Sequence, residues 1–272
     1  MPPHRARYFE RIKMISIVTG TLNRVKYLGG LIENTVESTD GKYLELVLVD
    51  GGSTDGTLEY IKRLNHPRVK LIEVGKRSSY PHYMNLGVET AKYENICQWN
   101  DDVLLCNKWE DVFNTIDDEH DAYLFNWKEG DTESMKYLNW TNCSGMRDNG
   151  WIIINNAEYN YPQAAGEKFK EVCMNYGIYK KDVFRKYGLY NTSYQYYCAD
   201  SEMAMRAYHS GAKFKTCFDI KVCVLPAEKR AIMIQEDIKR HSIDCSYYTT
   251  PTEITGLTIK QLFDESCGEY LV

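Results

Sequence analysis

The sequence predicts an α/β fold in which a mostly parallel central sheet carries helices on both faces. Short apolar, β-branched runs that are typical of buried strands alternate with segments of helical spacing through residues 14–105. Polar and acidic clusters follow directly after these predicted strands. Because ligands of open α/β sheets bind at the carboxyl ends of the strands, the pattern also predicts a ligand site at that end of the sheet.

Residues 14–105 supply the regular part of this pattern. The predicted strands cover 14–19, 43–49, 69–74 and 94–99, and the predicted helices cover 25–36, 58–64 and 80–91. The strand at 43–49 is almost continuously apolar, as expected for a parallel sheet that is covered on both faces. We therefore expect four successive strand units in this half.

The rest of the chain is less regular. Strands are predicted at 122–127, 151–154, 213–218 and 221–225, and helices at 179–187, 200–210, 228–240 and 258–263. No internal repeat and no clear linker interrupts the chain. We therefore expect a single domain over residues 1–272, with a front half (14–105), a more variable half (106–225) and a C-terminal helical segment (226–272).

Composition narrows the function classes. The net charge of −5 at pH 7 argues against a general nucleic-acid binder, which needs a basic face. Nine cysteines without a CxxC spacing indicate reduced thiols and a cytoplasmic location. Residues 1–13 are basic and lack the apolar core of a signal peptide, and no apolar run is long enough for a transmembrane segment. Peripheral contact of this basic end with anionic lipid headgroups stays open.

The stretch Asn100-Asp101-Asp102 follows the predicted strand at 94–99. Adjacent carboxylates repel each other, and a divalent cation or water usually offsets that cost. Oxygen ligands with open coordination positions suit Mg²⁺ or Mn²⁺ that holds a diphosphate. Taken alone, however, the three residues fit a solvated turn better, with Asp101 capping the next helix.

Five motifs, in order and spacing, resemble those of GT-A glycosyltransferases of family 2. They are Ile15–Arg24 (ISIVTGTLNR), Val47–Thr57 (VLVDGGSTDGT), Tyr83–Gly87 (YMNLG), Asn100–Asp102 (NDD) and Ala199–Glu202 (ADSE), the last followed by Arg206 and Gly211. The resemblance spans roughly residues 14–225. It implies a GT-A, Rossmann-like domain whose 14–105 half binds a nucleotide and whose 106–225 half binds an acceptor.

The resemblance also implies which residues contact a nucleotide-sugar donor. These are Thr19, Gly20, Thr21, Asn23, Arg24, Asp50, Gly51, Asn85, Asn100 and Asp101. Asp50 would accept the imino proton of uracil, with Gly51 and Gly52 letting the backbone approach a flat base. Local turn hydrogen bonds explain Thr19 and Thr21 equally well, and Arg24 suits either the diphosphate or a helix carboxylate.

Metal and catalytic roles follow from the same resemblance. Asp102 is the expected direct ligand of Mn²⁺ or Mg²⁺, with Asp101 bridging ribose or metal. Asn100 replaces the first aspartate of the family's Asp-x-Asp motif and removes one charge from the site. A third ligand, often a late histidine in such enzymes, stays open, with His209 and His241 as candidates. Asp200 at a helix start is the expected general base, kept ionised by the helix dipole, and Glu202 is a weaker alternative.

The predicted function is metal-dependent, inverting transfer of a sugar from a UDP-sugar to an acceptor hydroxyl of a glycan or glycoconjugate. One alternative is a catalytically silent nucleotide-sugar or glycan-binding protein, which Asn100 and the missing histidine favour. A nucleotidyltransferase is a second alternative, although Gly20 and Arg24 alone do not form its glycine-rich, basic phosphate loop. A dehydrogenase is disfavoured because no GxGxxG follows a strand.

Overall fold

The computed structural model of the chain describes residues 14–39, 43–129, 152–153, 171–172, 174–225 and 235–249. The strands are β1 (Ile15–Thr21), β2 (Leu44–Asp50), β3 (Val69–Glu73), β4 (Asn95–Gln98), β5 (Val103–Leu105), β6 (Ala122–Glu129), β7 (Ile152–Ile153), β8 (Glu171–Val172), β9 (Gly177–Lys180) and β10 (Phe214–Val224). The helices are α2 (Val25–Ile32), the π-helical turn η1 (Glu33–Glu37), α3 (Thr57–Leu64), α4 (Tyr80–Thr90), α5 (Trp109–Thr115), α7 (Lys181–Tyr187), α8 (Ala199–His209) and α9 (Gln235–Thr249).

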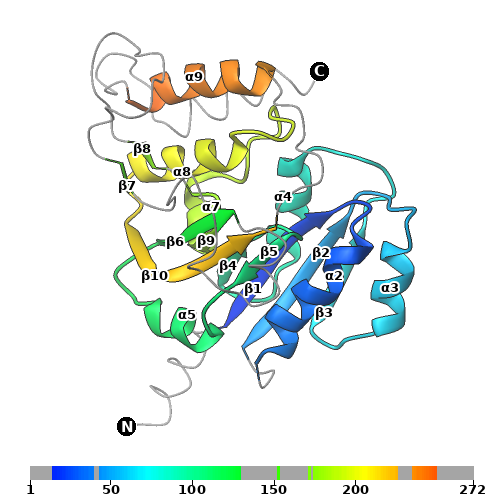
Figure 1. Cartoon of the computed structure of the whole chain (residues 1–272). Coiled ribbons are helices and arrows are strands. Elements are labelled where there is room, and N and C mark those ends of the chain that lie inside the picture. The colour runs from blue at the N-terminus through cyan, green and yellow to red at the C-terminus, as the bar shows by residue number, and fades with distance from the viewer. Residues whose placement is uncertain are drawn as a thin grey trace.

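An eight-stranded sheet organises these elements, in the order β3-β2-β1-β4-β9-β6-β10-β5 (Figure 1). β1 pairs in parallel with β2 and β4, β2 with β3, and β6 with β10. Only β9 and β5 run antiparallel to their neighbours within the described sheet. The predicted mostly parallel α/β sheet is therefore confirmed. The register sets Thr21 opposite Asp50, so the carboxyl ends of β1 and β2 lie side by side.

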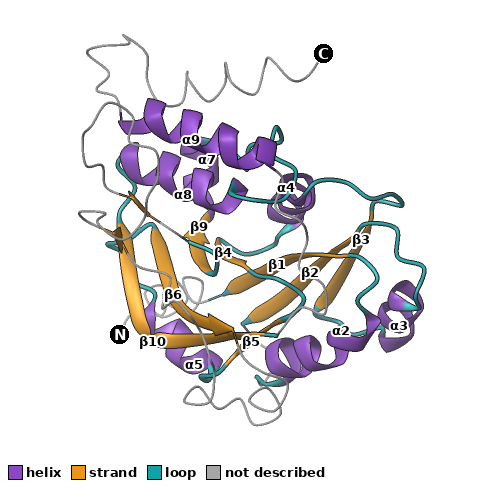
Figure 2. Ribbon diagram, turned by 45° about the horizontal axis from the view of Figure 1, so that its top comes forward, coloured by secondary structure: helices purple, strands orange, loops and turns teal. Residues whose placement is uncertain are grey.

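Helices cover both faces of this sheet, as the buried strands require. One apolar cluster joins Ile17 of β1 to α2 and α5, and the other joins Val18 to α4, α7 and α8. Neighbouring side chains of β1 thus point to opposite faces of the sheet, as the two-residue period of a β-strand requires. Figure 2 shows α2, α3 and α5 on one side of the sheet and α4, α7, α8 and α9 on the other.

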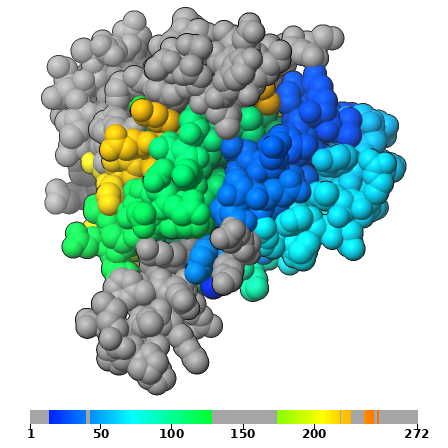
Figure 3. All heavy atoms as spheres, turned by 60° about the horizontal axis from the view of Figure 1, so that its bottom comes forward, coloured from blue at the N-terminus to red at the C-terminus, as the bar shows by residue number. Residues whose placement is uncertain are grey.

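Figure 3 shows a face of the molecule on which blue and cyan residues of the front half (14–105) border the green residues, which continue to position 129. This contact agrees with the sheet, which takes strands from the front half and from the 106–225 half. No helix among the described residues is both long and apolar enough to cross a membrane.

Two local predictions were wrong. The helix expected over 179–187 begins only at Lys181, because Gly177–Lys180 form β9 between β4 and β6. A Cβ at Gly177 would lie 2.1 Å from the Tyr123 carbonyl oxygen, so this close strand packing depends on glycine. The two strands expected over 213–225 are one strand, β10, with a register shift between Cys217 and Lys221.

The remaining outcomes concern short elements and the predicted C-terminal helices. β5 and α5 were not predicted, because their short apolar runs carry no clear period. The strand expected at 151–154 is present as β7, in a separate two-stranded sheet with β8. The helix expected over 228–240 is described only from Gln235 and continues to Thr249. The helix expected at 258–263 lies outside the described residues.

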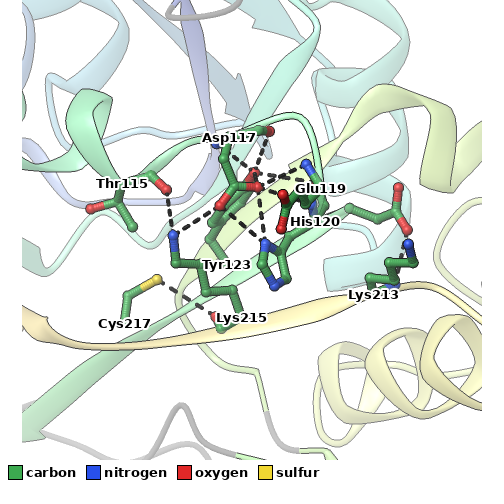
Figure 4. Close-up of polar contacts among 9 residues, drawn as sticks. Thr115, Asp117, Glu119, His120, Tyr123, Lys213, Lys215 and Cys217 are labelled. Atoms are coloured by element: carbon green, nitrogen blue, oxygen red, sulfur yellow. Dashed lines mark hydrogen bonds and ion pairs between the residues drawn. The ribbon is translucent and has the colours of Figure 1, made fainter.

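A polar cluster around Asp117 fixes the connection between α5 and β6 (Figure 4). Asp117 accepts hydrogen bonds from the backbone amides of Glu119 and His120 and from Lys215 Nζ of β10 at 2.9 Å. Tyr123 donates to the Asp117 carbonyl oxygen at 2.7 Å. Because β6 begins at Ala122, the cluster lies at the amino ends of the strands, opposite the end where a ligand site is expected. We assign it to stability of the fold.

Candidate active site

The turn after β4 brings the acidic residues to the end of β1. Asp101 is buried, and Thr21 Oγ1 donates to its Oδ2 at 2.8 Å. Arg24 Nε lies 3.7 Å from Asp101 Oδ1, and Arg24 Nη2 lies 3.7 Å from Asp102 Oδ2. The structure therefore gathers Thr21, Arg24, Asp101 and Asp102 at the carboxyl ends of β1 and β4. Arg24 pairs with these two carboxylates rather than with a helix carboxylate.

The charges in this group are incompletely balanced. Burial and then the neighbouring Asp102 raise the pKa of Asp101 to about 7, although Arg24 and Thr21 oppose the rise. Burial also raises the pKa of Asp102, and Arg24 again opposes it. A site that disfavours its own negative charge is suited to a bound cation. The oxygens of two adjacent carboxylates are hard ligands, and such ligands fit Mg²⁺ or Mn²⁺.

A complete protein cage for a metal is not present in the described residues. They contain no group of three or more His, Cys, Asp or Glu that could hold an ion. His241 is buried in α9, where burial lowers its pKa to about 4 and Glu202 of α8 opposes the shift. The ring of His209 packs edge-on against Tyr208. Neither candidate histidine joins Asp102, so phosphate oxygens and water would have to complete the coordination.

The loops after β1 and β2 hold each other in place. Both Asp50 oxygens accept hydrogen bonds within the β2 loop, one from the amides of Gly52 and Ser53 at 2.8 and 2.9 Å, the other from the Ser53 hydroxyl. Asn23 donates its backbone amide to Ser53 Oγ at 2.8 Å and accepts from the Thr54 amide at 2.8 Å. Asp50 and Asn23 thus form hydrogen bonds with the loops themselves. Their expected contacts with a nucleotide-sugar donor stay predictions.

Gly20 and Gly51 face the ring of Tyr83 from α4. A Cβ at Gly51 would lie 2.4 Å from the Tyr83 hydroxyl, and one at Gly20 would lie 3.0 Å from the ring. The Tyr83 hydroxyl also accepts from the Ser78 amide at 2.5 Å. The glycines therefore make room for a side chain of the protein itself. Thr19 is buried, and its hydroxyl donates to the Gly20 carbonyl oxygen at 3.0 Å, a local contact.

Asn85 binds the protein backbone. Its Nδ2 donates to the Tyr190 carbonyl oxygen, and its Oδ1 accepts from the Tyr190 amide, both at 2.9 Å. Tyr190 is buried, and its hydroxyl donates to Gln98 Oε1 of β4 at 2.5 Å. Asn85 therefore links α4 to the segment that follows α7, and its expected donor contact stays a prediction.

Asn100 links the acidic turn to Tyr176, the residue before β9. Its Nδ2 donates to the Tyr176 hydroxyl at 3.3 Å. Burial raises the pKa of Tyr176 well above its ordinary value, and the charges of Asp102 and Asp200 add to the rise. The charges of Asp102 and Asp200 thus both act on the Tyr176 hydroxyl, although these two carboxylates are almost a hundred residues apart in sequence.

Asp200 lies in the first turn of α8 and accepts a hydrogen bond from the Ser201 amide at 2.9 Å. Burial raises its pKa to about 6, so burial outweighs the helix dipole that was expected to keep it ionised. A carboxylate with this pKa can still accept a proton near neutral pH. Glu202 is fully buried and pairs with Arg206 at 2.8 Å, which removes it as an alternative base.

Sequence analysis did not predict the buried polar side chains that interact electrostatically with Asp200 or that hold the segment of Tyr176. The charge of Asp200 contributes to the raised pKa values of Tyr80 and Tyr190 after the larger effect of burial. Gln98 Nε2 donates to the carbonyl oxygens of Met174 and Asn175 and so holds the segment that carries Tyr176. The glutamine between the apolar residues Cys97 and Trp99 was the available signal. Nothing in the sequence distinguished Tyr176 from the other tyrosines.

Fold and site together define an α/β protein with an acidic, oxygen-rich site at the carboxyl ends of its parallel strands. Residues 16–188 match the model of the family described as Glycosyl transferase family 2. Since the match covers more than half of the sequence, the chain belongs to this family. A comparison with curated proteins found no match.

Solved structures with a similar fold include S. aureus TarS and the mannosyltransferase PcManGT. S. aureus TarS 1–349 in complex with UDP-GlcNAc gives a TM-score of 0.61 at 19% identity, over 95% of this chain and 71% of that chain. The mannosyltransferase PcManGT from Pyrobaculum calidifontis, in complex with GDP-Man and Mn²⁺, gives 0.56 at 15% identity, over 98% and 83%.

A longer S. aureus TarS structure gives a TM-score of 0.58 at 15% identity, over 90% of this chain. The present chain spans only 46% of that TarS chain. Identities this low show a shared fold alone. The expected GT-A fold is thereby confirmed.

Proposed function

We propose that this chain transfers a sugar from a nucleotide-sugar donor, a UDP-sugar, to an acceptor hydroxyl of a glycan or glycoconjugate, with inversion at the anomeric carbon. The observation that carries the proposal is the cluster of Thr21, Arg24, Asp101 and Asp102 at the carboxyl ends of β1 and β4. An inverting transfer needs such a site for the diphosphate and a carboxylate base, for which we propose Asp200. Family membership supports the reaction class, and the TarS complexes with UDP and UDP-GlcNAc support the uridine donor.

In the proposed reaction, Asp200 takes the proton of the acceptor hydroxyl while the acceptor oxygen attacks the anomeric carbon. The bond from that carbon to the diphosphate breaks on the opposite face, and the nucleoside diphosphate leaves with the electron pair. Arg24, which pairs with Asp101 and Asp102, would contact the departing diphosphate.

Asp102, together with Asp101, would hold Mn²⁺ or Mg²⁺. The ion would supply positive charge next to the diphosphate oxygens, which lowers the cost of the developing charge. The Mn²⁺ in the structure of PcManGT with GDP-Man is in accord with this assignment. The acceptor would contact the 106–225 half, and a cytoplasmic location remains the prediction from cysteine content.

The test is an assay of transfer with a panel of nucleotide sugars, followed by NMR of the product's anomeric proton. We expect turnover of a UDP-sugar that requires Mn²⁺ or Mg²⁺ and gives the inverted anomer. A retained anomer would contradict Asp200 as a base for direct displacement. Tight binding of UDP-sugars without turnover, over a broad acceptor panel, would instead favour a nucleotide-sugar-binding protein.

A further inference from the structure

Helix α9 presents a row of buried polar side chains to the segment before α8. Asp237, His241 and Asp244 lie at helical spacing and are 2%, 2% and 4% exposed. α9 lies along α8, which begins with the turn that carries Asp200 (Figure 1). Buried polar side chains are costly unless they are bonded, so their partners indicate what the helix does.

The partners of Asp237 are three consecutive backbone amides. Its Oδ1 accepts from the Gln195 amide at 2.9 Å, and its Oδ2 accepts from the amides of Tyr196 and Tyr197 at 2.9 and 3.0 Å. Hydrogen bonds to an ionised acceptor are about twice as strong as neutral ones. A carboxylate has acceptors for all three amides, whereas a carboxamide has only one oxygen and would turn a donor toward them.

The other side of this segment is held by the entrance to α4. The Gln195 carbonyl oxygen accepts from the Tyr80 amide at 2.8 Å, and the Tyr196 hydroxyl accepts from Arg77 Nε at 2.8 Å. Residues 195–197 are therefore fixed from both sides. The ring of Tyr80 also packs edge-on against Tyr190.

The next residue, Cys198, has a φ of 62° and forms the N-cap of α8. A left-handed conformation is uncommon in a residue other than glycine and persists only where the surroundings impose it. The amide of Tyr197, directly before Cys198, is one of the three that Asp237 binds.

We propose that Asp237 is a positioning residue, which holds residues 195–197 so that Cys198 keeps its left-handed conformation and Asp200 faces the acceptor. The inference rests on the proposed function of Asp200. It gives the α9 helix a role in turnover, beyond covering α8.

The test compares Asp237→Asn with Asp244→Asn as a matched control. Asp244 lies on the same helix, is equally buried, and accepts from the Tyr194 hydroxyl at 2.7 Å, a contact that asparagine can keep. At a temperature where all variants are folded, we expect Asp237→Asn to lower kcat at least tenfold with an unchanged Kd for UDP. The control should keep kcat within about twofold. An Asp237→Asn enzyme with wild-type kcat would overturn the proposal, as would an equal loss in the control.

A second readout does not depend on turnover. Hydrogen exchange of the peptide that spans residues 194–203 should become faster in Asp237→Asn than in Asp244→Asn, and equal exchange would overturn the positioning role. If the wild type transfers no sugar while exchange changes as expected, the proposed function fails and the structural part of the inference stands. Should Asp237→Asn not fold, Asp237→Glu keeps the charge but displaces the acceptors by one methylene. Wild-type kcat and exchange in that variant would also overturn the proposal.

Discussion

Asp101 couples the charge of the site to the stability of the fold. Its folded pKa of about 7 lies above the ordinary carboxyl value of 3.8, so the folded state keeps a proton that the unfolded state has lost. Stability is therefore highest below about pH 4 as far as this group is concerned, and it falls as pH rises through the window from about 4 to 7. A bound cation would remove this penalty.

Asp101→Asn tests that coupling. The variant should raise the Tm of the metal-free protein at pH 8 by a few degrees, since about 1 kcal/mol corresponds to about 2–4 °C in a chain of this size. Near pH 3 the two proteins should unfold at similar temperatures, because Asp101 is then mostly protonated in both states. Thermal unfolding followed by circular dichroism at both pH values measures this. An equal difference in Tm at the two pH values would contradict the account.

Asp200→Asn tests the assigned base. Loss of the base should lower kcat by about 10²–10⁴-fold and leave the Kd for UDP unchanged. In the wild type, kcat should fall below about pH 6 as Asp200 becomes protonated, and this acidic limb should be absent from the variant. Steady-state kinetics across pH 5–9, with calorimetry for UDP, provide the comparison. More than half of the wild-type kcat in the variant would exclude Asp200 as the base.

At the residue scale, the sequence indicated which residues of the candidate site lie together but not what each side chain contacts. Asp101, Asp102 and Arg24 were placed together because strand ends meet at one end of a parallel sheet. The contacts of Asn85 and Gly51 are set by Tyr190 and Tyr83, which are far away in the chain, and a linear pattern does not contain them. The role of Gly51, for instance, depends on the ring of Tyr83.

Among the elements, α4 is tied to the segment after α7 through Asn85. Asn85→Ala leaves the buried amide and carbonyl of Tyr190 without this partner, at a cost of about 1–3 kcal/mol for an unsatisfied buried group. We expect Tm to drop by several degrees and the folded variant to bind UDP normally. Thermal unfolding and calorimetry on one preparation decide this. Weakened UDP binding at an unchanged Tm would restore Asn85 as a donor contact.

The elements predicted best are those with a clear period. α4 and the core of β2 follow from apolar spacing, and α8 begins within a residue of its predicted start. β9 was predicted as part of a helix because its residues have no decisive period. Pairing with β4 and β6 makes it a strand, and that pairing is a property of the assembled sheet.

For the whole molecule, one sheet takes strands from both halves of the sequence. β5 of the front half pairs with β10 near the end of the described chain, and β9 lies between β4 and β6. We propose on this basis that the chain acts as one domain, with the donor and acceptor halves meeting at β4 and β9. The Asn100–Tyr176 hydrogen bond crosses that junction.

The central claim is a metal-dependent donor site at the Asp101–Asp102 turn. Thermal unfolding with UDP, with and without Mn²⁺, tests it most directly, because a ligand that binds the native state raises Tm by mass action. We predict a rise that requires both UDP and Mn²⁺, is lost in Asp102→Ala and is kept in Asp200→Asn. No change in Tm with any nucleoside diphosphate, in a folded sample with Mn²⁺ present, would contradict the claim.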